Sequence, residues 1–308
     1  MQQADCIGID IGYGFTKTCR SGDKQMFPTA ITLMAREATF SDVSPVVVNG
    51  HRFLVGKEAE REGNTIDTRH SRFVTSDAWL AILGHCLKIN DFVKGEMVLG
   101  VPPGMYSREY GQRIRDAIKG SDIRVGEEPY RFNGNIKIIP QGAGIFFRYV
   151  KDHPDDFRKN VTVIDIGHHT VDMTFFAEGK YVESATESQE LGVSLILDSI
   201  VKAFYRENRF SIGFKAALDI LLDGQITYLG TIYAVDVREE VIRYTQRISS
   251  VMDRYLEKLP VQPDVGIMGG GGAAVIRDLV SLRHRLLMVS EPAMANAVGY
   301  WHFGSNAR

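Results

Sequence analysis

The sequence contains the run Asp-Ile-Gly twice, at Asp10-Ile11-Gly12 and at Asp165-Ile166-Gly167, almost half a chain apart. Each copy ends an apolar segment, and a second strand-like segment follows within a few residues. A strand that ends in a carboxylate and turns through glycine exposes backbone N–H groups beside one acid, which suits a metal-bound phosphate. One such hairpin is an ordinary turn. Two copies, each opening one half of the chain, predict two related domains that bind one ligand between them.

The bulk composition describes a globular chain. It has 308 residues, enough for two domains with separate cores. The net charge of −2 favours neither a nucleic-acid surface nor a disordered acidic tail. The N-terminal segment has no signal-peptide pattern, and the apolar runs are too short to cross a bilayer. We therefore expect a cytoplasmic protein with no membrane contact and no direct binding of nucleic acid.

The three cysteines, Cys6, Cys19 and Cys86, form an odd set without paired spacing. Cys6 and Cys19 lie on the two predicted strands of the first hairpin, so a disulfide between them is one option. Free thiols in a reducing cytosol are the favoured alternative.

Alternating strand and helix patterns predict an α/β fold. In the first half they are a hairpin at 45–56 around Asn49-Gly50, a helix through 79–87, a strand at 97–101, a helix capped by Ser107, strand-like segments at 130–132 and 136–139 around Asn133-Gly134, and a helix at 143–150. In the second half they are strands up to 185, helices at 192–207 and 236–259, a strand at 265–268, a helix at 273–280, and a last helix near Pro292. The polar stretch 152–160 is the expected hinge.

The first loop offers one acid, two glycines and a lysine on the return strand. Gly12 and Gly14 allow the backbone to approach phosphate oxygens, and Lys17 supplies a point charge. The alternative is a tight hairpin with a surface lysine.

The second loop offers Asp165, Gly167 and the hydroxyl of Thr170. If Asp10 and Asp165 face each other, they can hold a hydrated Mg²⁺, which keeps most of its waters. His168 and His169 form a possible metal pair, but adjacent residues of an extended chain point apart, so a shared metal is the weaker interpretation.

Two further segments join a strand to a helix. The run Gly269 to Gly272 ends a strand and opens a helix, which lets a planar base and ribose lie against bare backbone. Gln141 follows the strand at 136–139 and can orient a water for in-line attack, or instead bond to local backbone. The small-residue helix it opens and a similar one at 290–299 can pack closely as a pivot.

Taken in order, these elements resemble the actin-like ATPase superfamily, which includes sugar kinases and the seventy-kilodalton heat-shock chaperones. The elements are a phosphate hairpin, a connecting helix with glutamine, a second hairpin, an adenosine glycine run and a second connecting helix. The resemblance covers the chain from Ile7 to about Gly299. The opening 8–17 segment is most similar to prokaryotic plasmid-segregation actins, the ParM/StbA group. The resemblance implies an α/β protein with the two-domain actin/sugar-kinase/heat-shock-chaperone ATPase fold, in which a nucleotide cleft lies between duplicated domains.

The resemblance also implies roles for particular residues. The first phosphate loop would be Asp10, Gly12, Tyr13, Gly14 and Lys17. The second would be Asp165, Gly167, His168, His169 and Thr170, with Gly269, Gly270, Gly271 and Gly272 as the adenosine loop. Gln141 would position the hydrolytic water, and Asp10 and Asp165 would hold Mg²⁺ through water. Family members often have further glycines where this chain has the two histidines, which affects nucleotide preference, ATP or GTP; His168 hydrogen-bonding to the ribose is one option.

The implied domains are 1–158, with a small insertion at about 36–76, and 159–291, with an insertion at about 194–262. The helix at 292–308 would return to the first domain. The implied function is a Mg-ATP hydrolase that forms head-to-tail filaments, with a DNA-bound adaptor protein as a possible partner in plasmid segregation or another cytoskeletal role. The alternatives are a non-polymerising small-molecule kinase and a nucleotide-binding scaffold.

Overall fold

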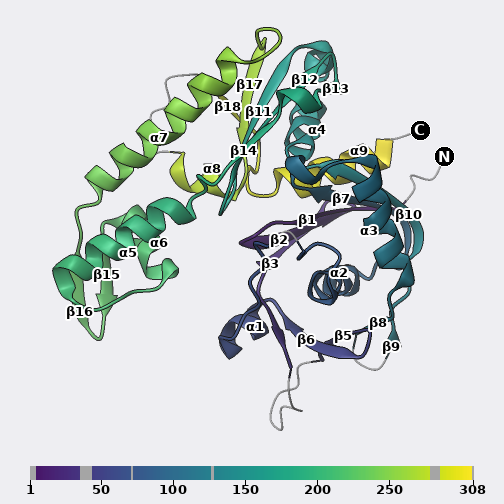
Figure 1. Cartoon of the computed structure of the whole chain (residues 1–308), viewed down its shortest axis with the longest axis horizontal. Coiled ribbons are helices and arrows are strands. Elements are labelled where there is room, and N and C mark those ends of the chain that lie inside the picture. The colour runs from purple at the N-terminus through teal and green to yellow at the C-terminus, as the bar shows by residue number, and fades with distance from the viewer. Residues whose placement is uncertain (1–4, 35–43, 71, 126–127, 278–284, 307–308) are drawn as a thin grey trace. The chain divides into compact units, whose positions relative to one another are not determined.

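The computed structural model describes residues 5–34, 44–70, 72–125, 128–277 and 285–306. The chain divides into two compact units, coloured along the chain in Figure 1. The first unit comprises 1–157 and 289–308, and the second comprises 158–288. Each unit has its own hydrophobic core.

The main sheet of the first unit has the strand order β10-β7-β1-β2-β3. Its strands are β1 (Cys6–Ile11), β2 (Phe15–Arg20), β3 (Asp23–Pro28), β7 (Lys94–Val101) and β10 (Asn133–Pro140). β1, β7 and β10 are parallel, whereas β2 and β3 are antiparallel to their neighbours. The carboxyl ends of the three parallel strands therefore share one edge of the sheet.

A second sheet of this unit has the order β4-β6-β5-β8-β9. Its strands are β4 (Ile31–Leu33), β5 (Val46–Val48), β6 (His51–Val55), β8 (Ile123–Val125) and β9 (Glu128–Pro129). The predicted turn joins β5 to β6, since Asn49 and Gly50 both have positive φ, 50° and 87°. α2 (Asp77–Ile89) lies between the two sheets (Figure 1), and nine of its residues are buried.

The remaining helices of the first unit are α1 (Lys57–Glu62), α3 (Arg108–Gly120), α4 (Ala143–Asp152) and α9 (Ala295–Asn306). Ser107 caps α3 as predicted, because its side chain accepts a hydrogen bond from the N–H of Tyr110. α4 and α9 cross with their backbones in contact. A Cβ on Gly144 would lie 2.4 Å from the carbonyl oxygen of Asn296, so only glycine permits this crossing.

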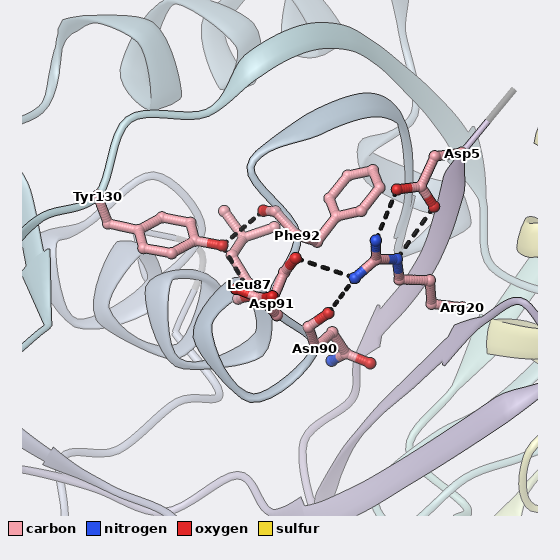
Figure 2. Close-up of polar contacts among 7 residues, drawn as sticks. All are labelled: Asp5, Arg20, Leu87, Asn90, Asp91, Phe92 and Tyr130. Carbon is pink, nitrogen blue, oxygen red and sulfur yellow. Dashed lines mark hydrogen bonds and ion pairs between the residues drawn. The ribbon is translucent and has the colours of Figure 1, made fainter.

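Contacts at the end of α2 attach this helix to the main sheet (Figure 2). Arg20 of β2 donates to both carboxylate oxygens of Asp5 and to the backbone carbonyls of Asn90 and Asp91. The Tyr130 hydroxyl lies 2.9 Å from the carbonyl oxygen of Leu87 and 2.6 Å from that of Phe92. Arg20 and Tyr130 therefore bring hydrogen-bond donors to backbone carbonyls at and just beyond the C-terminal end of α2.

The sheet of the second unit repeats the topology of the first, with the order β13-β12-β11-β17-β18. Its strands are β11 (Val161–Ile166), β12 (Val171–Ala177), β13 (Lys180–Tyr181), β17 (Val265–Gly269) and β18 (Leu287–Met288), with β14 (Glu187–Gln189) also paired to β12. Here too three strands, β18, β17 and β11, are parallel and lie side by side in the sheet, and the strands next to β11 on its other side, β12 and β13, are antiparallel to their neighbours. The two units are therefore built on one plan.

The helices of the second unit are α5 (Ser194–Asn208), α6 (Phe214–Asp223), α7 (Arg238–Glu257) and α8 (Gly271–Ile276). α5, α6 and α7 pack their apolar sides into one core, which also receives a two-stranded hairpin, β15 (Gln225–Tyr228) and β16 (Thr231–Ala234). Of the predicted helix at 273–280, residues 278–280 lie outside the described residues, as do 36–43 and 71 of the predicted insertion.

One local expectation is wrong. Asn133-Gly134 forms no turn but begins β10, where a Cβ on Gly134 would lie 2.1 Å from the carbonyl oxygen of Gly95 on β7. The glycine there permits close approach of two strands. The favoured expectation of free thiols is confirmed for Cys6 and Cys19, which are free and buried, and Cys19 pairs with Gly8 rather than with Cys6 across the first hairpin. Burial raises the pKa of the Cys19 thiol to about 11.

Among the described residues, no helix combines the length and apolar character needed to cross a membrane.

Candidate functional site

The two Asp-Ile-Gly hairpins have the same register. Asp10 pairs with Lys17 across β1 and β2, and Asp165 pairs with Asp172 across β11 and β12. In both hairpins the isoleucine after the acid is the last paired residue before the loop. Aligning the two registers places His169 where the first loop has Gly14. The repeat seen in the sequence is thus a repeat of three-dimensional structure.

Asp10 is buried, with 3% of its surface exposed, and both carboxylate oxygens accept hydrogen bonds. Lys17 Nζ lies 3.1 Å from Oδ2, and Gln141 Nε2 lies 3.1 Å from Oδ1. Gln141 reaches Asp10 because β1 and β10 end at the same sheet edge, and its N–H donates to the carbonyl of Val101 at the end of β7, 2.7 Å away. The main sheet therefore assembles three predicted site residues into one group.

The side-chain amide of Gln141 has a defined orientation. A carboxylate only accepts hydrogen bonds, so the amide nitrogen must face Asp10. The carbonyl oxygen Oε1 is left as the group that can accept a hydrogen bond from water. The next residue fixes the backbone at Gln141. Gly142 has a φ of 85°, and its N–H donates to Oδ1 of Asn296 on α9, 3.2 Å away.

The glycines of the first loop are constrained by its own turn. A Cβ on Gly12 would lie 3.0 Å from the carbonyl oxygen of Phe15 and 3.5 Å from Lys17 Nζ. The carbonyl of Gly14 accepts from the N–H of Thr29, 2.9 Å away. Burial raises the pKa of Tyr110 on α3, and Tyr13 of the first loop adds to this rise.

In the second loop two carboxylates lie opposite each other. Asp165 and Asp172 are both buried, and the Thr170 hydroxyl donates to Asp172 Oδ2, 2.9 Å away. Because its proton is committed to Asp172, Thr170 offers its oxygen as an acceptor, which suits water or a cation better than phosphate. Asp172 was not predicted as a site residue. The available signal was its spacing from Asp165, the same as that of Lys17 from Asp10.

His168 and His169 hold the second loop through their backbones. The carbonyl oxygens of Gly167, His168 and His169 accept hydrogen bonds from three consecutive N–H groups, those of 193, 194 and 192, at 3.1, 2.8 and 2.9 Å. The side chains have separate neighbours. The His168 ring lies 6.1 Å from the Phe214 ring, and His169 Nε2 lies 3.9 Å from Glu190 Oε1. Within the described part of the chain, no three His, Cys, Asp or Glu side chains form a metal-binding group.

The four glycines at 269–272 do not serve one purpose. Gly269 pairs with Asp165 in the sheet. A Cβ on Gly270 would lie 2.3 Å from Asp165 Oδ1, and one on Gly272 would lie 2.6 Å from the carbonyl oxygen of Gly167. A Cβ on Gly271, in contrast, would meet nothing within 4 Å. Gly270 and Gly272 are therefore needed for packing on the second hairpin, whereas Gly271 has open space beside it.

Each unit thus gathers one set of the predicted residues. The first unit brings together Asp10, Gly12, Lys17 and Gln141, with Tyr13 and Gly14 in the same loop. The second unit brings together Asp165, Gly167, Thr170 and the glycines 269–272, with His168 and His169 anchored in the loop.

Two family models match this sequence. Residues 8–144 match the N-terminal domain of actin-like proteins, and residues 163–281 match the C-terminal domain of archaeal MreB-like actin homologues. No curated protein matches the sequence.

Several solved structures share the fold over nearly the whole chain. An archaeal actin homologue is 19% identical, with a TM-score of 0.80 over 96% of this chain and 98% of that one. A ParM filament from Clostridium botulinum is 20% identical, with a TM-score of 0.78 over 98% of this chain and 99% of that one. The archaeal homologue in complex with ADP is 19% identical, with a TM-score of 0.75 over 96% of this chain and 97% of that one.

The matched regions together span most of the sequence, and each unit carries its Asp-Ile-Gly hairpin on a sheet of the same plan. The chain therefore belongs to the actin-like protein superfamily.

Proposed function

We propose that this chain is an ATPase that binds Mg-ATP with both Asp-Ile-Gly hairpins, hydrolyses it, and assembles head to tail into nucleotide-dependent filaments. The observation that carries the proposal is the group of Asp10, Lys17 and Gln141 at the carboxyl edge of the first sheet, matched by a hairpin of the same register in the second unit. The two units correspond in this proposal to actin-like domains I and II, with the larger helical part of the second, about 194–262, as an insertion.

The residues fit a hydrated magnesium ion. Asp10 and Asp165 are buried carboxylates at the ends of equivalent strands, and Mg²⁺ prefers oxygen ligands while keeping several waters. Bound Mg²⁺ would neutralise charge on the phosphates during transfer. Asp10 and Asp165 would hold the ion through water. Lys17, now paired with Asp10, supplies the cationic nitrogen that can turn to a phosphate oxygen.

Gln141 orients the hydrolytic water in this proposal. Its Oε1 accepts a hydrogen bond from the water, whose oxygen attacks the γ-phosphorus while the bond to the bridging β,γ-oxygen breaks. ADP and inorganic phosphate leave, and the water protons pass to phosphate and solvent. A glutamine positions the water without removing its proton, so catalysis rests on geometry and on stabilisation of charge.

Self-assembly is proposed from the fold and its relatives. A ParM filament and an ADP complex of an archaeal actin homologue both have this fold. A contact between unlike faces of successive copies does not close, which is the geometry of a filament. Plasmid segregation through a DNA-bound adaptor, or another cytoskeletal role in the cytoplasm, is the process we propose for such filaments.

The test is phosphate release from ATP and from GTP, with and without Mg²⁺, by the wild-type chain and by Asp10→Ala and Asp165→Ala. We expect Mg²⁺-dependent hydrolysis that both substitutions reduce strongly. Full activity in either variant would show that the paired hairpins do not bind the nucleotide. Transfer of the γ-phosphate to a small-molecule hydroxyl, in place of water, would identify a kinase instead.

A further inference from the structure

The segment that carries Gln141 is held by three other elements. The backbone N–H of Gln141 donates to the carbonyl of Val101 at the end of β7, and its side-chain amide donates to Asp10 at the end of β1, 3.1 Å away. The third contact comes from α9, where Oδ1 of Asn296 accepts from the N–H of Gly142 at 3.2 Å. The sheet thus holds Gln141 itself, and a residue 154 positions further along the chain than Gly142 holds the peptide bond that follows.

The contact between Asn296 and Gly142 is buried and has one orientation. Asn296 is 6% exposed. A backbone N–H only donates, so the amide oxygen of Asn296 must face it. Gly142 directly precedes α4, and the N–H groups at the start of a helix have no partner within the helix. Asn296 therefore supplies an acceptor for a buried donor that α4 cannot satisfy.

The close crossing of α4 and α9 brings this acceptor within reach. A Cβ on Gly144 would overlap the backbone of Asn296, and a Cβ on Gly299 would overlap the carbonyl oxygen of Gly144. Side chains at these two glycines would push the helices apart. Their absence allows a side chain as short as that of asparagine to reach from α9 to the residue at the start of α4.

We propose that Asn296 is a positioning residue for hydrolysis, which keeps Oε1 of Gln141 at the place where that atom orients the attacking water. This inference rests on the proposed function, since it requires Gln141 to act on a water. Asn296 itself contacts neither the water nor the nucleotide and acts only through the peptide between Gln141 and Gly142.

The physical link is the rigidity of that peptide. Without Asn296 the buried N–H of Gly142 loses its acceptor, and the cost of an unsatisfied donor favours rotation of the peptide toward another acceptor. The peptide unit is planar, so this rotation also moves the backbone of Gln141. A displacement of about 1 Å in a group that positions a reactant can lower the rate about a hundredfold.

The experiment compares single-turnover phosphate release with the affinity for the magnesium complex of a non-hydrolysable ATP analogue, both in the full-length chain. Asn296→Ala removes the acceptor. We expect its rate to fall roughly tenfold to a hundredfold, while its dissociation constant changes by less than about twofold. Asn296→Asp keeps an acceptor oxygen at the same place, and its rate should remain within about fivefold of wild type.

A double-mutant cycle shows whether Asn296 acts through Gln141. In a Gln141→Ala background no side-chain oxygen is left to displace, so adding Asn296→Ala should lower the rate by less than about twofold. Equal losses in the two backgrounds would overturn the inference, because a general effect on the fold persists when the side chain of Gln141 is absent.

Val298→Ala is the matched control. Val298 is buried on the same helix in a cluster with Cys19 and Ala297, so its truncation loosens the packing of α9 without removing the acceptor. It should lower stability and leave the rate and the affinity of the folded chain unchanged. If Asn296→Ala does not fold, Asn296→Ser takes its place, since its shorter side chain leaves the oxygen out of reach of Gly142.

A folded Asn296→Ala chain that hydrolyses ATP at the wild-type rate would overturn the inference while the proposed function stands. Equal losses of rate and affinity would also overturn it, as would an Asn296→Asp chain no faster than Asn296→Ala. A wild-type chain that releases no phosphate from Mg-ATP would overturn the proposed function itself.

Discussion

Both oxygens of Asp10 accept hydrogen bonds from this chain's own nitrogen atoms, one from Lys17 and one from Gln141. These contacts hold a buried carboxylate in a charge-neutral group, which is how a protein tolerates such a residue near its core. They also orient Gln141 so that its carbonyl oxygen is available to water. The motif in the sequence indicated the acid, but the role of Gln141 depends on a contact between two strand ends that only the folded sheet creates.

Gln141→Ala should separate hydrolysis from binding. The phosphate and metal contacts proposed for Lys17, Asp10 and Asp165 remain, so nucleotide should still bind. The rate of phosphate release should fall roughly a hundredfold or more, since a positioned group contributes several kcal/mol to the transition state. Single-turnover phosphate release measures the effect. Gln112→Ala, which removes an exposed glutamine paired with Asp116, is the control and should hydrolyse at the wild-type rate. Normal hydrolysis by Gln141→Ala would exclude Gln141 as the water-positioning residue.

The glycine run offers a paired test of packing. Gly272→Ala places a methyl group 2.6 Å from the backbone oxygen of Gly167, and it should cost about 1–3 kcal/mol or more of unfolding free energy. Gly271→Ala meets nothing within 4 Å, and an alanine in a helix should leave stability unchanged or raise it by up to about 1 kcal/mol. Urea denaturation of the two variants compares them directly. Equal stability of both would contradict the close packing of this run on the second hairpin.

At the scale of single residues, Asp10, Asp165 and Gln141 were proposed from position and type, and the first sheet brings Asp10 and Gln141 into contact. Asp172 was missed because its meaning lies in the register with Asp165. The contact of Phe214 with His168 was not predicted, because the two residues are distant in sequence and no local pattern brings them together. The dipeptide Asn133-Gly134 shows the opposite error: its glycine was interpreted as a turn residue but serves close strand packing.

At the scale of elements, the strands and helices with strong local signals were predicted well. The turn at Asn49-Gly50 and the Ser107 cap are both present. The hairpin of β15 and β16 was missed because its turn uses Leu229 and Gly230, both with positive φ, where leucine gives no turn signal. The crossing of α4 and α9 was predicted from small residues alone, and the contact of Gly144 with Asn296 confirms their close approach.

The C-terminal end of α2 should depend on Tyr130. Tyr130→Phe removes the hydroxyl that lies against the carbonyls of Leu87 and Phe92, leaving them without that donor, and should destabilise the chain by about 1–3 kcal/mol. Chemical denaturation measures the change. Tyr205→Phe alters an exposed tyrosine and should stay within about 0.5 kcal/mol of wild type. A Tyr130→Phe chain as stable as wild type would show that water replaces the hydroxyl.

Two histidines should make the first unit sensitive to acid. Burial lowers the pKa of His85 on α2 below its ordinary value of 6.5, and burial together with Lys151 and Arg148 lowers the pKa of His302 on α9. The unfolded chain therefore binds more protons than the folded chain, so stability should fall as the pH drops below about 6.5. Melting temperatures between pH 8 and 5 test this. His85→Leu should reduce the acid sensitivity, and an unchanged pH dependence in that variant would exclude His85 as a cause.

At the scale of the whole molecule, the chain repeats one plan twice. Each unit has a sheet of three parallel strands with antiparallel strands beside them. In each sheet the Asp-Ile-Gly hairpin joins one parallel strand to its antiparallel neighbour. The sequence revealed this repeat because the hairpins are local. The strand register adds that the two copies differ in charge, with Lys17 opposite one acid and Asp172 opposite the other. One hairpin thus offers a positive charge and the other a second negative charge, which suits a ligand that contains both phosphate and metal.

Sedimentation and phosphate release, followed together over time with Mg-ATP, with Mg-ADP and without nucleotide, test whether nucleotide hydrolysis controls assembly. We expect polymer that forms with Mg-ATP, accompanied by phosphate release, and is lost as ADP accumulates. Asp165→Ala should abolish both signals. Absence of both sedimentable polymer and phosphate release under every nucleotide condition, in a folded wild-type chain, would show that this protein is not a filament-forming ATPase.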